Sequence, residues 1–185
     1  MTEPEIKRID TKIVYKNRWM SVREDRVRRP NGDHGLFGVV DKPDFSLIIP
    51  FEAGKVHLVE QYRYPVDGRY WEFPQGSWEL DPDADPVKVA AGELAEETGL
   101  QAANITKLGK LHQAYGYSNQ AVHIFLATDL ESGDATPESE EQGLISETFS
   151  LADCNDMITD GRITDLATVG AMHLLERHLS QAAKK

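Results

Sequence analysis

Three glutamates, Glu93, Glu96 and Glu97, are the residues whose types and spacing best suit a chemical role. Residues three and four apart share one side of a helix, so the three carboxylates would lie together. Like charges at this spacing repel, and anions near a helix C-terminus oppose its dipole. A divalent cation would relieve both effects, and carboxylate oxygens suit Mg²⁺ or Mn²⁺. Taken alone, the same pattern also fits a solvent-exposed acidic face.

The segment between Asp85 and Gly99 is predicted to be the helix that carries these glutamates. Asp85 can cap its N-terminus, Pro86 suits the first turn, and Gly99 is typical of a helix end. Two further helices are predicted, one from a cap at Ser150 to Gly161 and one over residues 164–179. Their number and position favour helices that cover a sheet.

Short runs with alternating or β-branched character predict the strands of that sheet. They cover residues 12–15, 20–28, 36–42, 46–51, 55–61, 70–76, 105–111 and 122–130. Strands mixed with a few helices indicate an α/β fold in which helices pack on a sheet.

Composition narrows the class of protein. The 185 residues are 40% hydrophobic, which is enough for a substantial core. Lysine and arginine total 20 against 31 acidic residues, and the net charge of −11 disfavours nucleic-acid binding. A single cysteine excludes an internal disulfide. Without a long apolar stretch or an apolar leader at the N-terminus, we expect a soluble, cytoplasmic protein that does not bind membranes.

Residues 76–100 resemble the Nudix box, whose pattern is G-x5-E-x7-R-E-U-x-E-E-x-G-U with U apolar. The run 93–100 matches the C-terminal part of the box, and residues 72–76 match the strand and turn before it. Gly92 stands where the family has arginine, Ala84 stands where it has its first glutamate, and the loop is about two residues longer. In the family those two side chains pair, so their joint absence leaves no buried charge unpaired. We interpret this as structural variation.

Further segments resemble ADP-ribose pyrophosphatase-type Nudix enzymes: residues 17–20, 59–63 and 157–165. The resemblance implies a Nudix α/β/α sandwich with a mixed sheet over residues 46–185. It also implies an N-terminal β-strand extension over residues 1–45 that forms a homodimer. The substrate would be a small nucleotide, a nucleoside diphosphate linked to another moiety. ADP-ribose, cleaved to AMP and ribose 5-phosphate, is the first choice, and another nucleotide sugar is possible.

The same resemblance implies the metal ligands. Glu93, Glu96, Glu97 and the backbone carbonyl of Gln75 would bind Mg²⁺, with Mn²⁺ as an alternative. A glutamate from the loop 137–142 would act as the base in similar enzymes; Glu140 matches best, Glu141 is the alternative, and Glu96 completes the catalytic set.

Substrate contacts are assigned in the same way. Arg63 would hold phosphate in bidentate fashion, although a surface salt bridge is its alternative role. Glu72 is a second substrate-binding candidate. Trp19 is the preferred partner for stacking on the base, and Tyr115 is the next.

Two departures support other functions. Gln75 stands where this subfamily usually has alanine, and the run Phe73-Pro74-Gln75-Gly76 is similar to dinucleoside polyphosphate and RNA pyrophosphohydrolases. The changes at Gly92 and Ala84 would also suit a module that binds nucleotide without hydrolysing it.

Overall fold

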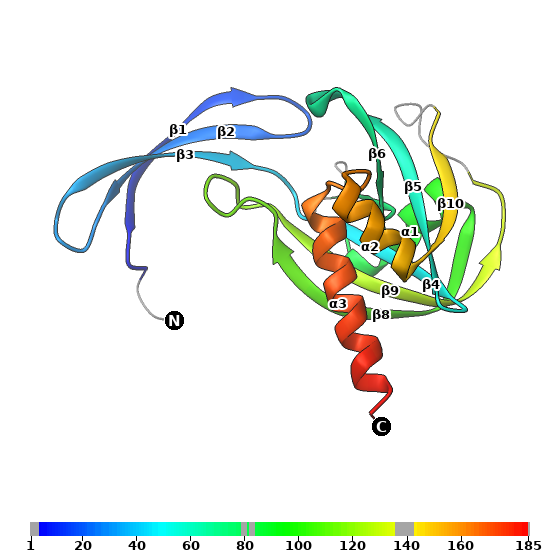
Figure 1. The fold of residues 1–185 in the computed structure, drawn as a ribbon. Helices are drawn as coiled ribbons and strands as arrows, with labels where there is room; N and C mark the ends of the chain where they lie inside the picture. Colours follow the sequence, from blue (N-terminus) through cyan, green and yellow to red (C-terminus); the bar gives the residue numbers. More distant parts are fainter. Residues whose placement is uncertain (1–3, 79–80, 82–83, 136–142, 185) are drawn as a thin grey trace. The chain divides into compact units, whose positions relative to one another are not determined.

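Two compact units make up the chain in the computed structural model, which describes residues 4–78, 81, 84–135 and 143–184 (Figure 1). One unit comprises Met1–Asp44 and His112–Ala121, and the other comprises Phe45–Leu111 and Val122–Lys185. Each unit has its own sheet.

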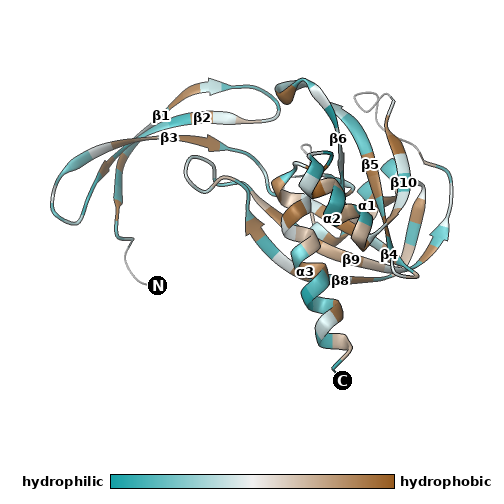
Figure 2. Ribbon diagram, in the orientation of Figure 1, coloured by the Kyte–Doolittle hydropathy of each residue, from teal (hydrophilic) through white to brown (hydrophobic). Residues whose placement is uncertain are grey.

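The first unit is built on an antiparallel sheet of β1 (Lys7–Lys16), β2 (Ser21–Arg28) and β3 (His34–Asp41), in that order. Asn17 stabilises the β1–β2 turn. Its side-chain oxygen accepts hydrogen bonds from the backbone N–H groups of Trp19 at 3.0 Å and Met20 at 2.8 Å. All three strands were predicted, but β1 begins at Lys7 rather than residue 12. Hydrophilic and hydrophobic segments alternate along them (Figure 2).

Seven strands of the described residues form the sheet of the second unit, in the order β10-β5-β4-β9-β8, with β6 beside β5 and β7 beside β4. The β4–β9 pair is parallel, so the sheet is mixed. The strands are β4 (Phe45–Glu52), β5 (Lys55–Arg63), β6 (Gly68–Glu72), β7 (Gln75–Gly76), β8 (Leu100–His112), β9 (Ala121–Ser132) and β10 (Ile145–Ser150).

Two features of this sheet differ from the sequence prediction. The strand expected over 70–76 was predicted to end at Pro74, and β6 does end before that residue because proline offers no N–H to a ladder, but a second short strand, β7, follows it. Strand β10 was not predicted at all. Its first four residues are exposed, so it lacks the buried apolar alternation that marks a strand in sequence.

Helices cover both faces of this sheet: α1 (Pro86–Thr98) on one, and α2 (Leu151–Asp160) and α3 (Leu166–Ala182) on the other. Alternation along β4 shows the arrangement, because successive side chains point to opposite faces. Leu47 and Ile49 belong to the core cluster that contains residues of α2 and α3, whereas Ile48 belongs to the cluster that contains residues of α1. The α/β/α sandwich expected from the resemblance is therefore confirmed.

The predicted helix caps are largely confirmed. Asp85 accepts a hydrogen bond from the N–H of Val87 at 3.2 Å, and Gly99 ends α1 with a φ of 70°. Ser150 forms a reciprocal capping box at the start of α2. Helix α3 is instead capped by Asp165, so it begins two residues later than predicted. Among the helices that the structure describes, none is long and apolar enough to cross a membrane.

Candidate active site

Helix α1 turns Glu93 and Glu97 toward the short strand β7. Glu93 and Glu97 are only 7% and 1% exposed, and Glu96 is half-buried. The backbone N–H of Gln75 donates to Oε2 of Glu97 at 3.3 Å. A Cβ atom on Gly76 would lie 2.4 Å from Oε1 of Glu93, so only glycine leaves room for that carboxylate. Strand β7 and helix α1 therefore fit together at Gln75, Gly76, Glu93 and Glu97.

Arg63, the last residue of β5, and Glu72, the last residue of β6, form an ion pair. Residues two apart in a strand share a face, which places Gln61 and Arg63 on the same side of β5. The side-chain amide of Gln61 donates to Oε1 of Glu72 at 2.9 Å, and Nε of Arg63 donates to Oε2 at 3.2 Å. The carboxylate of Glu72 is 4% exposed, whereas the guanidinium-bearing side chain is 40% exposed and can reach a ligand.

Charge interactions connect the Arg63–Glu72 ion pair with Glu97 of α1. Burial raises the pKa of Glu72, and the positive charge of Arg63 opposes that rise. Burial would lower the pKa of Arg63, but the negative charges of Glu72, Glu97 and Asp165 outweigh it and raise the pKa. The guanidinium is therefore held among three carboxylates from different elements of the second unit.

Asp165 contacts this cluster, and the sequence did not single it out as a candidate. Its Oδ2 atom accepts hydrogen bonds from the N–H and hydroxyl of Thr168, both at 2.8 Å, and from the side-chain amide of Gln75 at 3.1 Å. The Thr168 hydroxyl in turn accepts from the N–H of Phe73 at 3.1 Å. The N-terminus of α3 is thus joined to the segment that leads into β7. The sequence signal was an aspartate three residues before a threonine at a helix start.

The donor set on α1 fits a hard divalent cation in its chemistry, since every donor is oxygen. Burying two carboxylates four residues apart is unfavourable unless positive charge is nearby, and a cation would lower their repulsion. Across the described ranges, no three His, Cys, Asp or Glu side chains already converge closely enough to hold an ion. Glu93 and Glu97 would hold the ion, with Glu96 beside them, after their side chains adjust.

Four predicted residues remain: two belong to the first unit, and two lie outside the described residues. Trp19 and Tyr115 belong to the first unit, where they are 42% and 87% exposed. The guanidinium carbon of Arg18 lies 4.1 Å from the centre of the Trp19 ring. Glu140 and Glu141 lie outside the described residues. The roles of these four candidates stay predictions.

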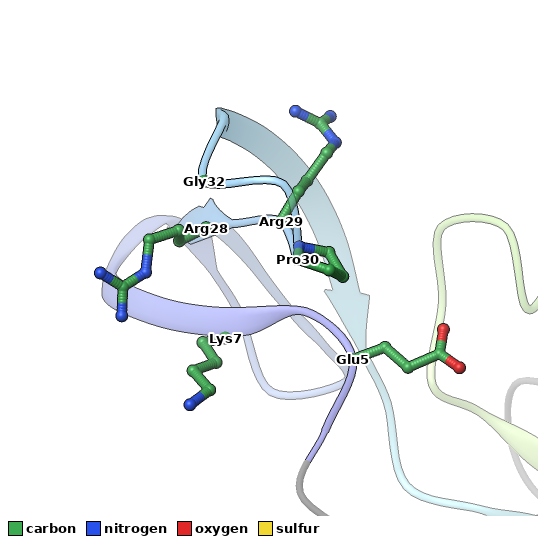
Figure 3. Close-up of a pocket in the computed structure, with 6 residues that line it drawn as sticks. All are labelled: Glu5, Lys7, Arg28, Arg29, Pro30 and Gly32. Carbon is green, nitrogen blue, oxygen red and sulfur yellow. The ribbon is translucent and has the colours of Figure 1, made fainter.

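A shallow depression in the first unit is lined by Glu5, Lys7, Arg28, Arg29, Pro30 and Gly32 (Figure 3). Three of these side chains are cationic, which could suit an anion. Figure 3 shows, however, that the charged groups point away from one another, so they do not converge on a common ligand. The cluster in the second unit is therefore the better candidate.

Comparison with known proteins shows the family of the chain. Residues 42–166 match the family model of the NUDIX domain, and residues 6–40 match that of the nucleoside diphosphate sugar hydrolase N-terminal domain. An ADP-ribose pyrophosphatase of Mycobacterium tuberculosis is 30% identical over 98% of this chain and 89% of that protein. Another from Bacillus subtilis is 26% identical over the full length of both.

A solved structure described as an ADP compounds hydrolase has the same fold, with a TM-score of 0.86, 22% identity and full coverage of both chains. Sandwich, carboxylate-bearing helix and family match together define a hydrolase of the pyrophosphatase type. The chain belongs to the Nudix family. The family generally uses divalent metal ions, in keeping with the oxygen donors on α1.

Proposed function

We propose that the enzyme hydrolyses the pyrophosphate bond of ADP-ribose to give AMP and ribose 5-phosphate, with Mg²⁺ as the metal. The observation that carries this proposal is the half-exposed Arg63, held by Glu72 on the sheet and placed within the field of Glu97. A guanidinium offers bidentate hydrogen bonds to a phosphate group. The charge interaction between Arg63 and Glu97 supports a site in which carboxylates that would bind metal and a cation that would bind phosphate act on one diphosphate.

In the reaction, the oxygen of a water molecule forms a bond to one phosphorus atom, and the anhydride P–O bond breaks. Bound Mg²⁺ would neutralise the diphosphate and lower the pKa of water. Arg63 would orient the diphosphate and stabilise its developing charge. Glu140 would accept the proton of the attacking water, with Glu141 as the alternative base. Gln75 would contribute its backbone carbonyl to the metal.

Substrate choice is tested by assaying the purified chain with ADP-ribose, a second nucleotide sugar, a dinucleoside polyphosphate and a 5′-triphosphorylated RNA. Metal is first removed with EDTA and then restored as Mg²⁺ or Mn²⁺, and products are separated by chromatography. We expect the highest kcat/KM for ADP-ribose and no turnover without metal. Preference for the dinucleoside polyphosphate would favour the function suggested by Gln75. Calorimetric binding of ADP-ribose without release of AMP would favour a sensing module.

The proposed base is tested in the same assay. Glu140→Gln is expected to lower kcat by about a hundredfold or more with little change in KM, because general base catalysis typically contributes 10²–10⁴-fold. Glu141→Gln is the matched variant and should retain most activity. The reverse pattern would transfer the role to Glu141, and two active variants would place the base elsewhere.

We also propose that the chain forms a homodimer through its N-terminal strands. The first unit exposes several large apolar side chains on its sheet, and such surfaces mark interaction sites. They include Ile9, Ile13, Tyr15, Leu36 and Phe37, which are 39–57% exposed. Light scattering of the full chain should give twice the mass of one chain. Ile13→Asp should lower that mass, whereas Asn31→Asp in the β2–β3 turn should not.

A further inference from the structure

Gly92 lies within α1, where glycine weakens a helix relative to alanine. The packing above it explains why no side chain is present. A Cβ atom at this position would lie 2.8 Å from Cζ2 and 3.5 Å from Cε2 of Trp78. The indole ring therefore rests directly on the helix backbone, in the space that a side chain would need.

The same position lies close to a proposed metal-binding residue. Oε1 of Glu96 is 3.7 Å from the Cβ site of Gly92, so the indole and the carboxylate lie around the same point of α1. Trp78 is half-buried, and it precedes the segment that leads from β7 into the helix. A bulky planar ring beside a glutamate limits the rotamers that the glutamate can adopt.

Backbone hydrogen bonds link Trp78 to the residues just before α1. The carbonyl of Trp78 accepts from the N–H of Asp81 at 3.0 Å, and the carbonyl of Asp81 accepts from the N–H of Ala84 at 3.0 Å. The second of these hydrogen bonds ends immediately before Asp85, which caps α1. The backbone of Trp78 is therefore connected to the start of the helix, while its side chain contacts the helix further along.

We propose that Trp78 is a positioning residue: its indole, seated on Gly92, holds the Glu96 carboxylate on the metal-facing side of α1. The proposal rests on the proposed function, because it assumes that Glu96 serves the metal. Gly92 and Trp78 form a matched pair, in which the missing side chain makes room for the large one. The contact supplies order at a point where the sequence departs from the Nudix box.

The pairing is tested by thermal unfolding of Gly92→Ala in two backgrounds. Where Trp78 is present, the new methyl group must displace the indole, so we expect the melting temperature to stay constant or fall. In a Trp78→Ala background the clash is gone, and the better helix propensity of alanine should raise the melting temperature by about 2–4 °C. Ala91→Gly, an exposed change in the same helix, should lower the melting temperature equally in both backgrounds. An equal shift for Gly92→Ala in both backgrounds would overturn the pairing.

The positioning role is tested by Mn²⁺ titration calorimetry and by kinetics with ADP-ribose. Trp78→Ala is expected to weaken Mn²⁺ binding and lower kcat by about tenfold each, in the range found when groups that orient metal ligands are changed. KM for ADP-ribose should stay within a factor of two or so of the wild-type value, and Trp78→Phe should restore most of both losses because it keeps an aromatic ring on Gly92.

Unchanged Mn²⁺ affinity in Trp78→Ala, with Glu97→Gln inactive, would overturn the positioning role alone. Full activity of Glu97→Gln would instead contradict the proposed function. The two failures are therefore distinguishable in one set of variants.

Discussion

Glu97→Gln is expected to lower kcat for Mg²⁺-dependent hydrolysis of ADP-ribose by about a thousandfold. A metal ion contributes several kcal/mol of transition-state stabilisation, and each 1.36 kcal/mol changes the rate about tenfold. Glu97 is 1% exposed, and its Oε2 atom accepts a hydrogen bond from the backbone N–H of Gln75. Glutamine keeps the size and an acceptor oxygen but removes the charge, so the contact with β7 should survive while the cation is lost.

Two measurements separate this effect from unfolding. Initial rates are recorded against Mg²⁺ concentration, and thermal unfolding is recorded with and without Mg²⁺. Wild-type protein should melt at a higher temperature with Mg²⁺, because a ligand that binds only the folded state stabilises it. Glu97→Gln should lose most of that shift, whereas Glu131→Gln, an exposed change at the end of β9, should keep it. Turnover at the wild-type rate in Glu97→Gln would remove this residue from the metal site.

Arg63→Met is expected to have the second largest effect, on both activity and stability. Loss of charged hydrogen bonds to phosphate, worth about 1.5–3 kcal/mol, should lower kcat/KM by about 10- to 100-fold. Removing one member of a buried ion pair typically costs about 3–5 kcal/mol. Because the Arg63 side chain is 40% exposed, solvent screening should reduce that loss to about 2 kcal/mol.

The loss of stability in Arg63→Met should depend on pH. Burial already raises the pKa of Glu72 in the folded protein, and Arg63 opposes the rise. Without Arg63, the pKa of Glu72 should be higher still. A group whose pKa is raised by folding favours the folded state below its unfolded pKa, and this contribution is lost as pH rises through the folded pKa. The variant should therefore be closest to wild type in acid and most destabilised at neutral pH.

Urea unfolding of both proteins at a series of pH values measures this difference. The double variant Arg63→Met/Glu72→Gln is the control, because it has no carboxyl group to titrate at position 72. Its stability relative to Glu72→Gln should be nearly independent of pH. An Arg63→Met deficit that is constant between acidic and neutral pH would show that Glu72 is not its source.

The carboxylate helix could be predicted from local sequence because each of its determinants acts on backbone or side chains within about one turn of itself. Asp85 and Gly99 bound α1 as predicted, and the four-residue spacing of Glu93 and Glu97 places both on the buried side. Such spacings follow from helix geometry and need no information about the rest of the chain. The resemblance to the Nudix box then supplied the fold and the class of enzyme.

Tertiary structure alone showed that Asp165 lies beside Gln75 and that Trp78 packs on Gly92. Gln75 and Asp165 are 90 positions apart in sequence and lie within hydrogen-bond distance. The indole of Trp78 fills the space above Gly92, which sequence reasoning recorded only as a missing arginine. These contacts depend on how strands and helices pack across the sheet, and packing is set by the shapes and burial of many side chains together. The sequence pattern therefore determined which helix carries the candidate metal-binding carboxylates. The packing of the fold determined which distant side chains surround that helix.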